Sequence, residues 1–200
     1  PLFTQEIYIG SNLDEFIFDK LKSNHSRNVV IVSESVYPKT KTLISKISDK
    51  EPIIIKSLEE NKSFDFIRTL INECHSRMLN RDSYLIGIGG GMIGDAIGFL
   101  SSIYMRGVKF VYIPTTLLSQ CDSTINKVAV SVDSTKNLVG SFYSPHITFC
   151  DTDYLMSLST KQISHGLIEV IKHALITDST KLKGLLKSNL EDKLNHWQKY

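Results

Sequence analysis

The sequence has little of what marks several classes of protein. Its 200 residues include only three cysteines, Cys74, Cys121 and Cys150, which form no CxxC pair and no evident disulfide framework. The net charge is +2 and Lys and Arg are scattered, so a nucleic-acid partner is disfavoured. No eighteen consecutive residues are apolar, and residues 1–6 lack a charged leader, so neither a membrane span nor a secretory signal is expected. We therefore expect a cytoplasmic protein with free, mostly buried thiols and no membrane partner.

Strand-like and helix-like segments alternate through the first three quarters of the chain. Strands are expected at residues 6–9, 28–32, 52–55, 83–88 and 109–113, and the β-branched runs at 28–32 and 52–55 are typical of strands buried on both faces of a parallel sheet. Helices are expected at 13–21, capped by Ser11 or Asn12, at 39–47 and at 63–79. This order predicts an α/β fold, a Rossmann-like, mostly parallel sheet flanked by helices.

The pattern changes character near Asp151. From Tyr154 onward it is helical only, with helices expected at 163–176 and 182–197 and no clear stop signal after them. We therefore expect a nucleotide-binding α/β domain at 1–151, followed at 152–200 by the beginning of an α-helical C-terminal domain.

Three adjacent glycines, Gly89–Gly91, separate an expected buried strand from an apolar helix that begins near Ile93. Residues without a Cβ can adopt positive φ and let a ligand approach, and the N-terminus of the helix suits a diphosphate. Gly94 and Gly98 would let the helix pack close to the sheet, and Asp95 is expected in its first turn, where it could also bind a ribose or nicotinamide. The run is neither GxGxxG nor a P-loop, and a tight turn without a ligand is the alternative.

Four ionisable residues lie at helical spacing in the second region. His165, Glu169 and His173 are four residues apart, so all three project from one helix face and could form a metal site. Three ligands on successive turns of one straight helix rarely converge on one ion, so both histidines are expected to face solvent or an interface. Lys172 follows Glu169 by three residues, which is also the spacing of a simple surface pair.

Several motifs in this order resemble the 3-dehydroquinate synthase family of sugar phosphate cyclases. They are Gly89-Gly90-Gly91-Met92-Ile93-Gly94-Asp95, Arg106-Gly107, the run Pro114–Ser123, the run Lys136–Tyr143 and the run Gly166–Lys172, with weaker agreement at Glu59–Ser63. Members of this family are longer, so the resemblance implies that this chain is the N-terminal portion, with the helical domain truncated.

The resemblance implies an NAD- and Zn²⁺-dependent (or Co²⁺-dependent) lyase of the shikimate pathway of aromatic amino acid biosynthesis. It would convert 3-deoxy-arabino-heptulosonate 7-phosphate to 3-dehydroquinate with elimination of phosphate. The cofactor-binding residues would be Glu59, Lys62, Gly90, Gly91, Asp95, Thr115 and Thr116. The residues around the substrate would be Asp122, Lys127, Lys136, Asn137 and Lys172. Arg106 would reach the substrate phosphate across the interface of a homodimer. Glu169 would be a metal ligand, joined by two histidines from beyond Tyr200.

The sequence departs from the family where the substrate would be held. The run from Asp122 to Lys127 is one residue shorter than usual and has no glycine, while Ser131 replaces a usual Asn and Thr135 a usual Gly. A related cyclase of the 2-deoxy-scyllo-inosose or epi-valiolone type therefore stays open. A glycerol dehydrogenase-like, NAD- and metal-dependent alcohol dehydrogenase also stays open, although such enzymes usually lack the Lys136–Asn137 pair. A non-catalytic nucleotide-binding module is a further alternative.

Overall fold

A six-stranded parallel sheet forms the centre of the molecule in the computed structural model, which describes residues 5–56, 62–122, 127–133 and 135–177. The strand order is β1-β8-β5-β4-β2-β3, and every pairing in this sheet is parallel. The strands are β1 (Glu6–Gly10), β2 (Val29–Ser33), β3 (Ile53–Ile55), β4 (Tyr84–Gly89), β5 (Lys109–Pro114) and β8 (Ile147–Asp151). The expected α/β fold is confirmed, but β3 lies at the edge of the sheet and Ile54 is 44 % exposed, so the prediction that this strand is buried on both faces is wrong.

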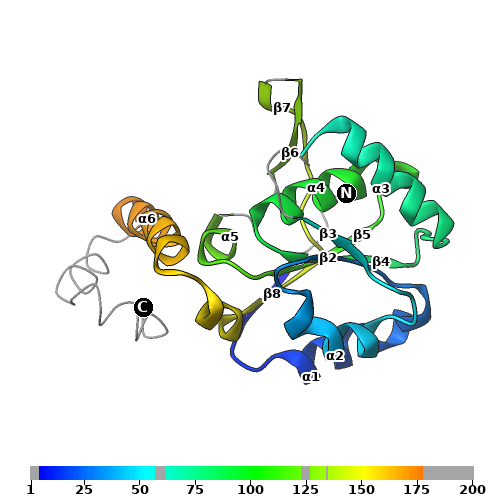
Figure 1. Cartoon of the computed structure of the whole chain (residues 1–200), viewed down its shortest axis with the longest axis horizontal. Coiled ribbons are helices and arrows are strands. Elements are labelled where there is room, and N and C mark those ends of the chain that lie inside the picture. Colours follow the sequence, from blue (N-terminus) through cyan, green and yellow to red (C-terminus); the bar gives the residue numbers. More distant parts are fainter. Residues whose placement is uncertain (1–4, 57–61, 123–126, 134, 178–200) are drawn as a thin grey trace.

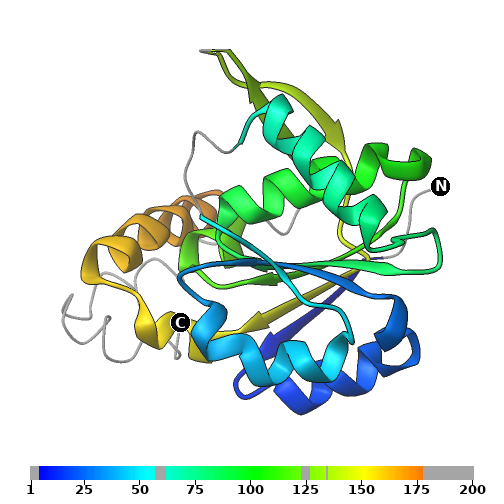
Figure 2. The same cartoon turned by 45° about the vertical axis from the view of Figure 1, so that its right-hand side comes forward.

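Helices cover both faces of the sheet (Figures 1 and 2). Helices α1 (Asp14–Leu21) and α2 (Tyr37–Ile47) lie on one face, and α3 (Phe64–Ser76) and α4 (Gly91–Ile103) lie on the other. In β2, Val30 and Val32 pack in the core beneath α1 and α2, whereas Val29 and Ile31 pack in the core beneath α3 and α4. All five residues of β2 are buried, as their β-branched run predicted.

An antiparallel hairpin that the sequence analysis did not predict stands over the α3–α4 face (Figure 1). Its strands are β6 (Lys127–Val132) and β7 (Thr135–Phe142). Val128 and Val130 are buried in the core against α4, and a Cβ added at Gly98 would lie 2.4 Å from Val128 Cγ1. The close packing expected of Gly98 therefore serves the hairpin as well as the sheet. Strand β8 was also not predicted.

Three helices pack together on the side of β8 (Figure 1). Helix α5 (Leu117–Asp122), the short helix η4 (Thr152–Ser157) and α6 (Thr160–Thr177) share a small core of Leu117, Leu155, Ile163 and Leu167. The predicted helix at 163–176 is confirmed by α6, and the one predicted at 182–197 lies outside the described residues. Two further short helices, η1 (Lys22–Arg27) and η3 (Tyr104–Arg106), complete the described elements. None of the helices described is long and apolar enough to cross a membrane.

The start of α1 is capped from a distant part of the chain. Leu13 occupies the N-cap position, and neither Ser11 nor Asn12 caps the helix with its side chain, so that prediction is wrong. Instead Leu13 N–H donates to Asp151 Oδ2 at 2.7 Å and Asn12 N–H donates to Asp153 Oδ2 at 3.0 Å. These carboxylates reach the helix because β1 and β8 are neighbours and end at the same edge of the sheet.

Candidate active site

The glycine turn lies at the topological switch point of the sheet, where the strand order reverses. Strands β2 and β4 are neighbours, but β2 leads to β3 on one side and β4 leads to β5 on the other. In open α/β sheets, ligands bind outside the carboxyl ends of the strands at such a point. The two loops adjoin there, since a Cβ added at Gly89 would lie 3.3 Å from the Cβ of Ser33.

Two glycines of the turn, Gly89 and Gly90, are required for space rather than for an unusual backbone. Gly90 is extended, with φ −76° and ψ −172°, and none of Gly89–Gly91 has positive φ, so that part of the expectation is wrong. A Cβ at Gly89 would lie 2.4 Å from Ile93 Cγ1, and one at Gly90 would lie 3.3 Å from Thr116 Cγ2. The turn therefore packs tightly between the first turn of α4 and the loop after β5.

Tyr112 supports the glycine turn from below, a role that the sequence analysis missed. Its buried hydroxyl donates to Gly90 O at 3.0 Å and lies 3.3 Å from Gly89 O. A Cβ at Gly94 would lie 2.7 Å from Tyr112 Cζ, so the close approach of α4 to the sheet predicted from this glycine is confirmed. Burial raises the pKa of Tyr112, so the hydroxyl stays a donor at neutral pH. A tyrosine inside an otherwise apolar, buried strand was the signal for this role.

The two threonines after β5 border the turn. Thr115 is buried, and its N–H donates to Gly89 O at 3.0 Å. Thr116 Oγ1 lies 2.8 Å from Ser119 Oγ and accepts from Ser119 N–H at 3.2 Å, which caps α5. Both residues thus fix the loop against which the turn packs.

Lys62, Asp95 and Asn137 are brought together, although they lie far apart in the sequence. The buried Lys62 ammonium pairs with the Asp95 carboxylate and donates to Asn137 Oδ1 at 2.5 Å. Asp95 is the fifth residue of α4, so the expectation that it lies in the first turn is wrong. The Lys62 ammonium stabilises the carboxylate instead. The β6–β7 hairpin also contacts Lys62, because Ser131 N–H donates to Lys62 O at 2.7 Å.

A cavity of about 250 Å³ opens beside this group. It is lined by Asp95, Asp122, Lys127, Ala129 and Asn137. One residue expected on the cofactor side thus faces three that were expected to hold the substrate. Ala129, which was not singled out from the sequence, also lines the cavity.

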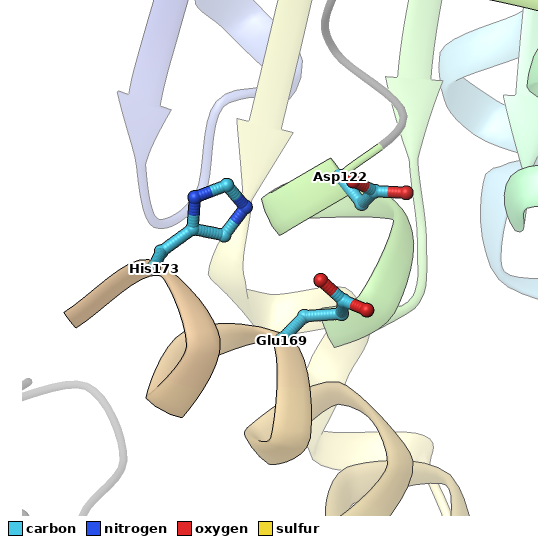
Figure 3. A group of neighbouring side chains, drawn as sticks. All are labelled: Asp122, Glu169 and His173. Carbon is cyan, nitrogen blue, oxygen red and sulfur yellow. The ribbon is translucent and has the colours of Figure 1, made fainter. Parts of the chain in front are cut away.

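Asp122, Glu169 and His173 converge at the end of α5 (Figure 3). One donor atom from each lies within 4.8 Å of the others. They converge because α6 packs closely on α5, where a Cβ at Gly166 would lie only 2.6 Å from Leu117 Cβ.

The three donors fit a divalent metal. Two carboxylates and an imidazole suit Zn²⁺ or Co²⁺. Among the described residues, the buried His173 Nε2 has no hydrogen-bond partner, which is unusual unless a ligand satisfies it. His173 is half-buried and belongs to this group, whereas His165 is exposed and lies outside it.

Lys172 supplies a positive charge to this group. Its ammonium pairs with Glu169 and lies 3.7 Å from Asp122 Oδ1. The hydrogen bond to Glu169 raises the pKa of Lys172, so it stays protonated. Burial, reinforced by Glu169 and Asp122, raises the pKa of the neighbouring Cys121, so its thiol is a poor metal ligand.

Three other residues expected in the site lie elsewhere or outside the described chain. Arg106 follows α4, whose 13 residues carry the chain from the glycine turn to the opposite edge of the sheet, a distance of roughly 20 Å. Lys136 is exposed on β7 beside Asn137. Glu59 lies outside the described residues.

Comparison with known proteins places the chain among relatives of one kind. A sequence profile described as 3-dehydroquinate synthase N-terminal matches residues 52–165. A 3-dehydroquinate synthase from Clostridium tetani is 39 % identical over 181 residues, which cover 86 % of this chain and 48 % of that enzyme. The chain spans about half the length of the curated relatives that it matches.

Solved structures agree with the fold. A 2-deoxy-scyllo-inosose synthase complexed with carbaglucose-6-phosphate, NAD⁺ and Co²⁺ superposes with a TM-score of 0.76 at 25 % identity, covering 83 % of this chain and 47 % of that one. A probable glycerol dehydrogenase from Sinorhizobium meliloti has a TM-score of 0.64 at 12 % identity, covering 78 % and 42 %, and shares the fold alone. With the profile matching more than half of its residues, the chain belongs to the 3-dehydroquinate synthase family.

Proposed function

We propose that this chain is the NAD-binding part of a sugar phosphate cyclase that converts 3-deoxy-arabino-heptulosonate 7-phosphate to 3-dehydroquinate and phosphate. The observation that carries the proposal is the cavity in which Asp95 faces Asp122, Lys127 and Asn137, beside a group of metal-ligand type. Similarity to the Clostridium tetani 3-dehydroquinate synthase supports this substrate. Residues 1–151 would form the nucleotide-binding domain and residues 152–200 the beginning of the metal and substrate domain. The reaction would belong to the shikimate pathway in the cytoplasm.

The glycine turn is the proposed seat of the cofactor. The NAD diphosphate would lie over Gly90 and Gly91, at the N-terminus of α4, where unpaired N–H groups favour an anion. Thr115 and Thr116 would flank the dinucleotide, and Lys62 with Glu59 would border its adenosine ribose. Bound NAD would supply a transient oxidation of a substrate hydroxyl, which would acidify the neighbouring C–H bond and allow phosphate to leave. A related solved structure, that of 2-deoxy-scyllo-inosose synthase, contains NAD⁺ and Co²⁺.

Glu169 is the proposed metal ligand, with Asp122 and His173 offering the neighbouring donors. A bound Zn²⁺ or Co²⁺ would polarise the reacting oxygen as a Lewis acid. Lys172, now paired with Glu169, would then be released towards the substrate, where it would join Lys127 and Lys136 in neutralising carboxylate and phosphate charge.

Arg106 is proposed to act in a second copy of the chain. It follows the C-terminal end of α4, roughly 20 Å from the glycine turn and at the opposite edge of the sheet. A homodimer that places Arg106 against its partner's cavity would complete both sites.

Mixed dimers of Arg106→Ala and Lys127→Ala chains test the role of Arg106. If Arg106 acts across the interface, each mixed dimer has one intact site and regains activity that neither parent dimer shows. If Arg106 acts within its own chain, both sites of the mixed dimer are defective and activity stays lost.

The full-length protein, assayed with NAD, Zn²⁺ and 3-deoxy-arabino-heptulosonate 7-phosphate, tests the reaction. We expect phosphate release that requires NAD, that a chelator abolishes and that Lys127→Ala removes. Phosphate release from another sugar phosphate only would support a cyclase but reject this substrate, an outcome that Ser131 and Thr135 make worth testing. NADH formation from glycerol without phosphate release would establish a dehydrogenase. NAD binding with neither reaction would leave a nucleotide-binding module.

A further inference from the structure

The turn between α4 and β5 holds its backbone in an unfavourable conformation. Met105, Arg106 and Gly107 have φ values of 50°, 66° and 119°, three consecutive residues in the left-handed region. For residues with a Cβ this region is disfavoured, so two such residues in succession persist only where their surroundings hold them.

Arg81 makes the side-chain contact that holds the centre of this turn. Its Nε and Nη2 both donate to Met105 O, at 3.0 and 2.8 Å. The flanks are fixed separately, because Tyr104 Oη donates to Leu79 O at 3.1 Å and Gly107 N–H donates to Tyr104 O at 2.9 Å. Arg81 precedes β4, whose first residue pairs with the first residue of β5, so it lies at the same edge of the sheet as the turn.

The side chain of Arg106 is exposed, and within the described residues it has no hydrogen bond or ion pair that the structure records. The strained backbone therefore does not serve an internal contact of this guanidinium. A guanidinium on a fixed backbone matches the geometry of a phosphate and loses less freedom on binding than one on a loose loop.

We propose that Arg81 is a positioning residue: it locks the left-handed turn so that Arg106 is presented to the substrate phosphate in the second copy of the chain. This inference rests on the role of Arg106 in the proposed function. Arg81 itself touches neither substrate nor cofactor and acts only through the Met105 carbonyl.

The test uses the full-length protein with the variants R81A, R106A, R81A/R106A and R81K, and with R77A as the matched control. Arg77 also directs its guanidinium at a backbone carbonyl, that of Glu51 at 3.4 Å, but away from the turn. We expect R81A to raise the KM for 3-deoxy-arabino-heptulosonate 7-phosphate and the inhibition constant of inorganic phosphate on the order of tenfold, with kcat nearly unchanged. R81K, which keeps one hydrogen bond, is expected to restore part of the affinity, and R77A to change neither constant.

Two further measurements separate positioning from general destabilisation. In the R106A background, adding R81A is expected to raise KM no further, because both changes remove the same contact. Amide hydrogen exchange of Gly107 and Val108 is expected to quicken in R81A but not in R77A.

A further rise of KM in the double variant, or unchanged exchange at these amides in R81A, would overturn the inference. Faster exchange in R81A together with an unchanged KM in R106A would refute the phosphate contact of Arg106, and with it both the proposed role and this inference.

Discussion

Removing the Asp95 carboxylate should destabilise the protein far more than removing a carboxylate from a surface ion pair. Asp95→Ala leaves the Lys62 ammonium, whose side chain is 7 % exposed, with the Asn137 amide oxygen as its one remaining polar side-chain partner among the described residues. Breaking a buried ion pair from one side typically costs about 3–5 kcal/mol of unfolding free energy. Because the Asp95 side chain is itself 27 % exposed, we expect the lower end, about 3 kcal/mol.

Two further variants give losses of unfolding free energy with which Asp95→Ala can be compared. Lys62→Met removes the buried cation and leaves Asp95, which water can partly hydrate, so a smaller loss of about 1–2 kcal/mol is expected. Glu15→Ala breaks the pair with Lys46, whose two side chains are 75 % and 38 % exposed, and should cost less than about 1 kcal/mol. The expected order of destabilisation is therefore Asp95→Ala, then Lys62→Met, then Glu15→Ala.

Urea unfolding followed by circular dichroism at pH 7 measures these differences, at low and at high salt. The loss in Asp95→Ala should change little with salt, whereas the small effect of Glu15→Ala should shrink further. A loss in Asp95→Ala no larger than that in Glu15→Ala would refute the reasoning, because it would show that the Lys62 ammonium is not held in a buried environment.

Three further predictions concern the rest of the site. Gly166→Ala places a methyl group 2.6 Å from Leu117 Cβ, so it should push α6 away from α5, lower the unfolding free energy by about 1–3 kcal/mol and weaken Co²⁺ binding. The cobalt absorption spectrum measures this binding, and an unchanged cobalt affinity would contradict the prediction. Tyr112→Phe keeps the packing but removes the hydrogen bond to Gly90 O, so it should cost about 1 kcal/mol and raise the Kd for NAD in calorimetry, and wild-type affinity would count against that role. Burial lowers the pKa of His146 below its unfolded value near 6.5, so the stability that its neutral form contributes is present above that pH and is lost as pH falls. His146→Gln should therefore flatten the decline of the urea midpoint between pH 7 and 5, and an equal decline in the variant and the wild type would exclude this role of His146.

The parallel sheet could be predicted because each of its central strands carries its own signal. A run such as Val29–Val32 is apolar at every position, which occurs when both faces of a strand are covered by helices. The glycine turn is equally local, since strand, glycines and apolar helix are continuous in sequence. In the hairpin, by contrast, most residues of β7 are exposed, and the buried residues of β6 are held by α4 and by the Lys62 backbone, which are distant in sequence. Local pattern could not reveal strands whose stability comes from those contacts.

The same distinction divides the candidate site. The residues beside the glycine turn could be recognised because one strand–turn–helix unit places them. The group of Asp122, Glu169 and His173 could not, because it depends on how two helices pack, and that packing turns on a single small residue, Gly166. Helical spacing correctly placed Glu169 and His173 on one face but could not supply the third donor, which comes from the end of α5. Arg106 follows the same logic on a larger scale: its motif is easily read, yet its proposed role depends on a second copy of the chain, which no pattern within one sequence encodes.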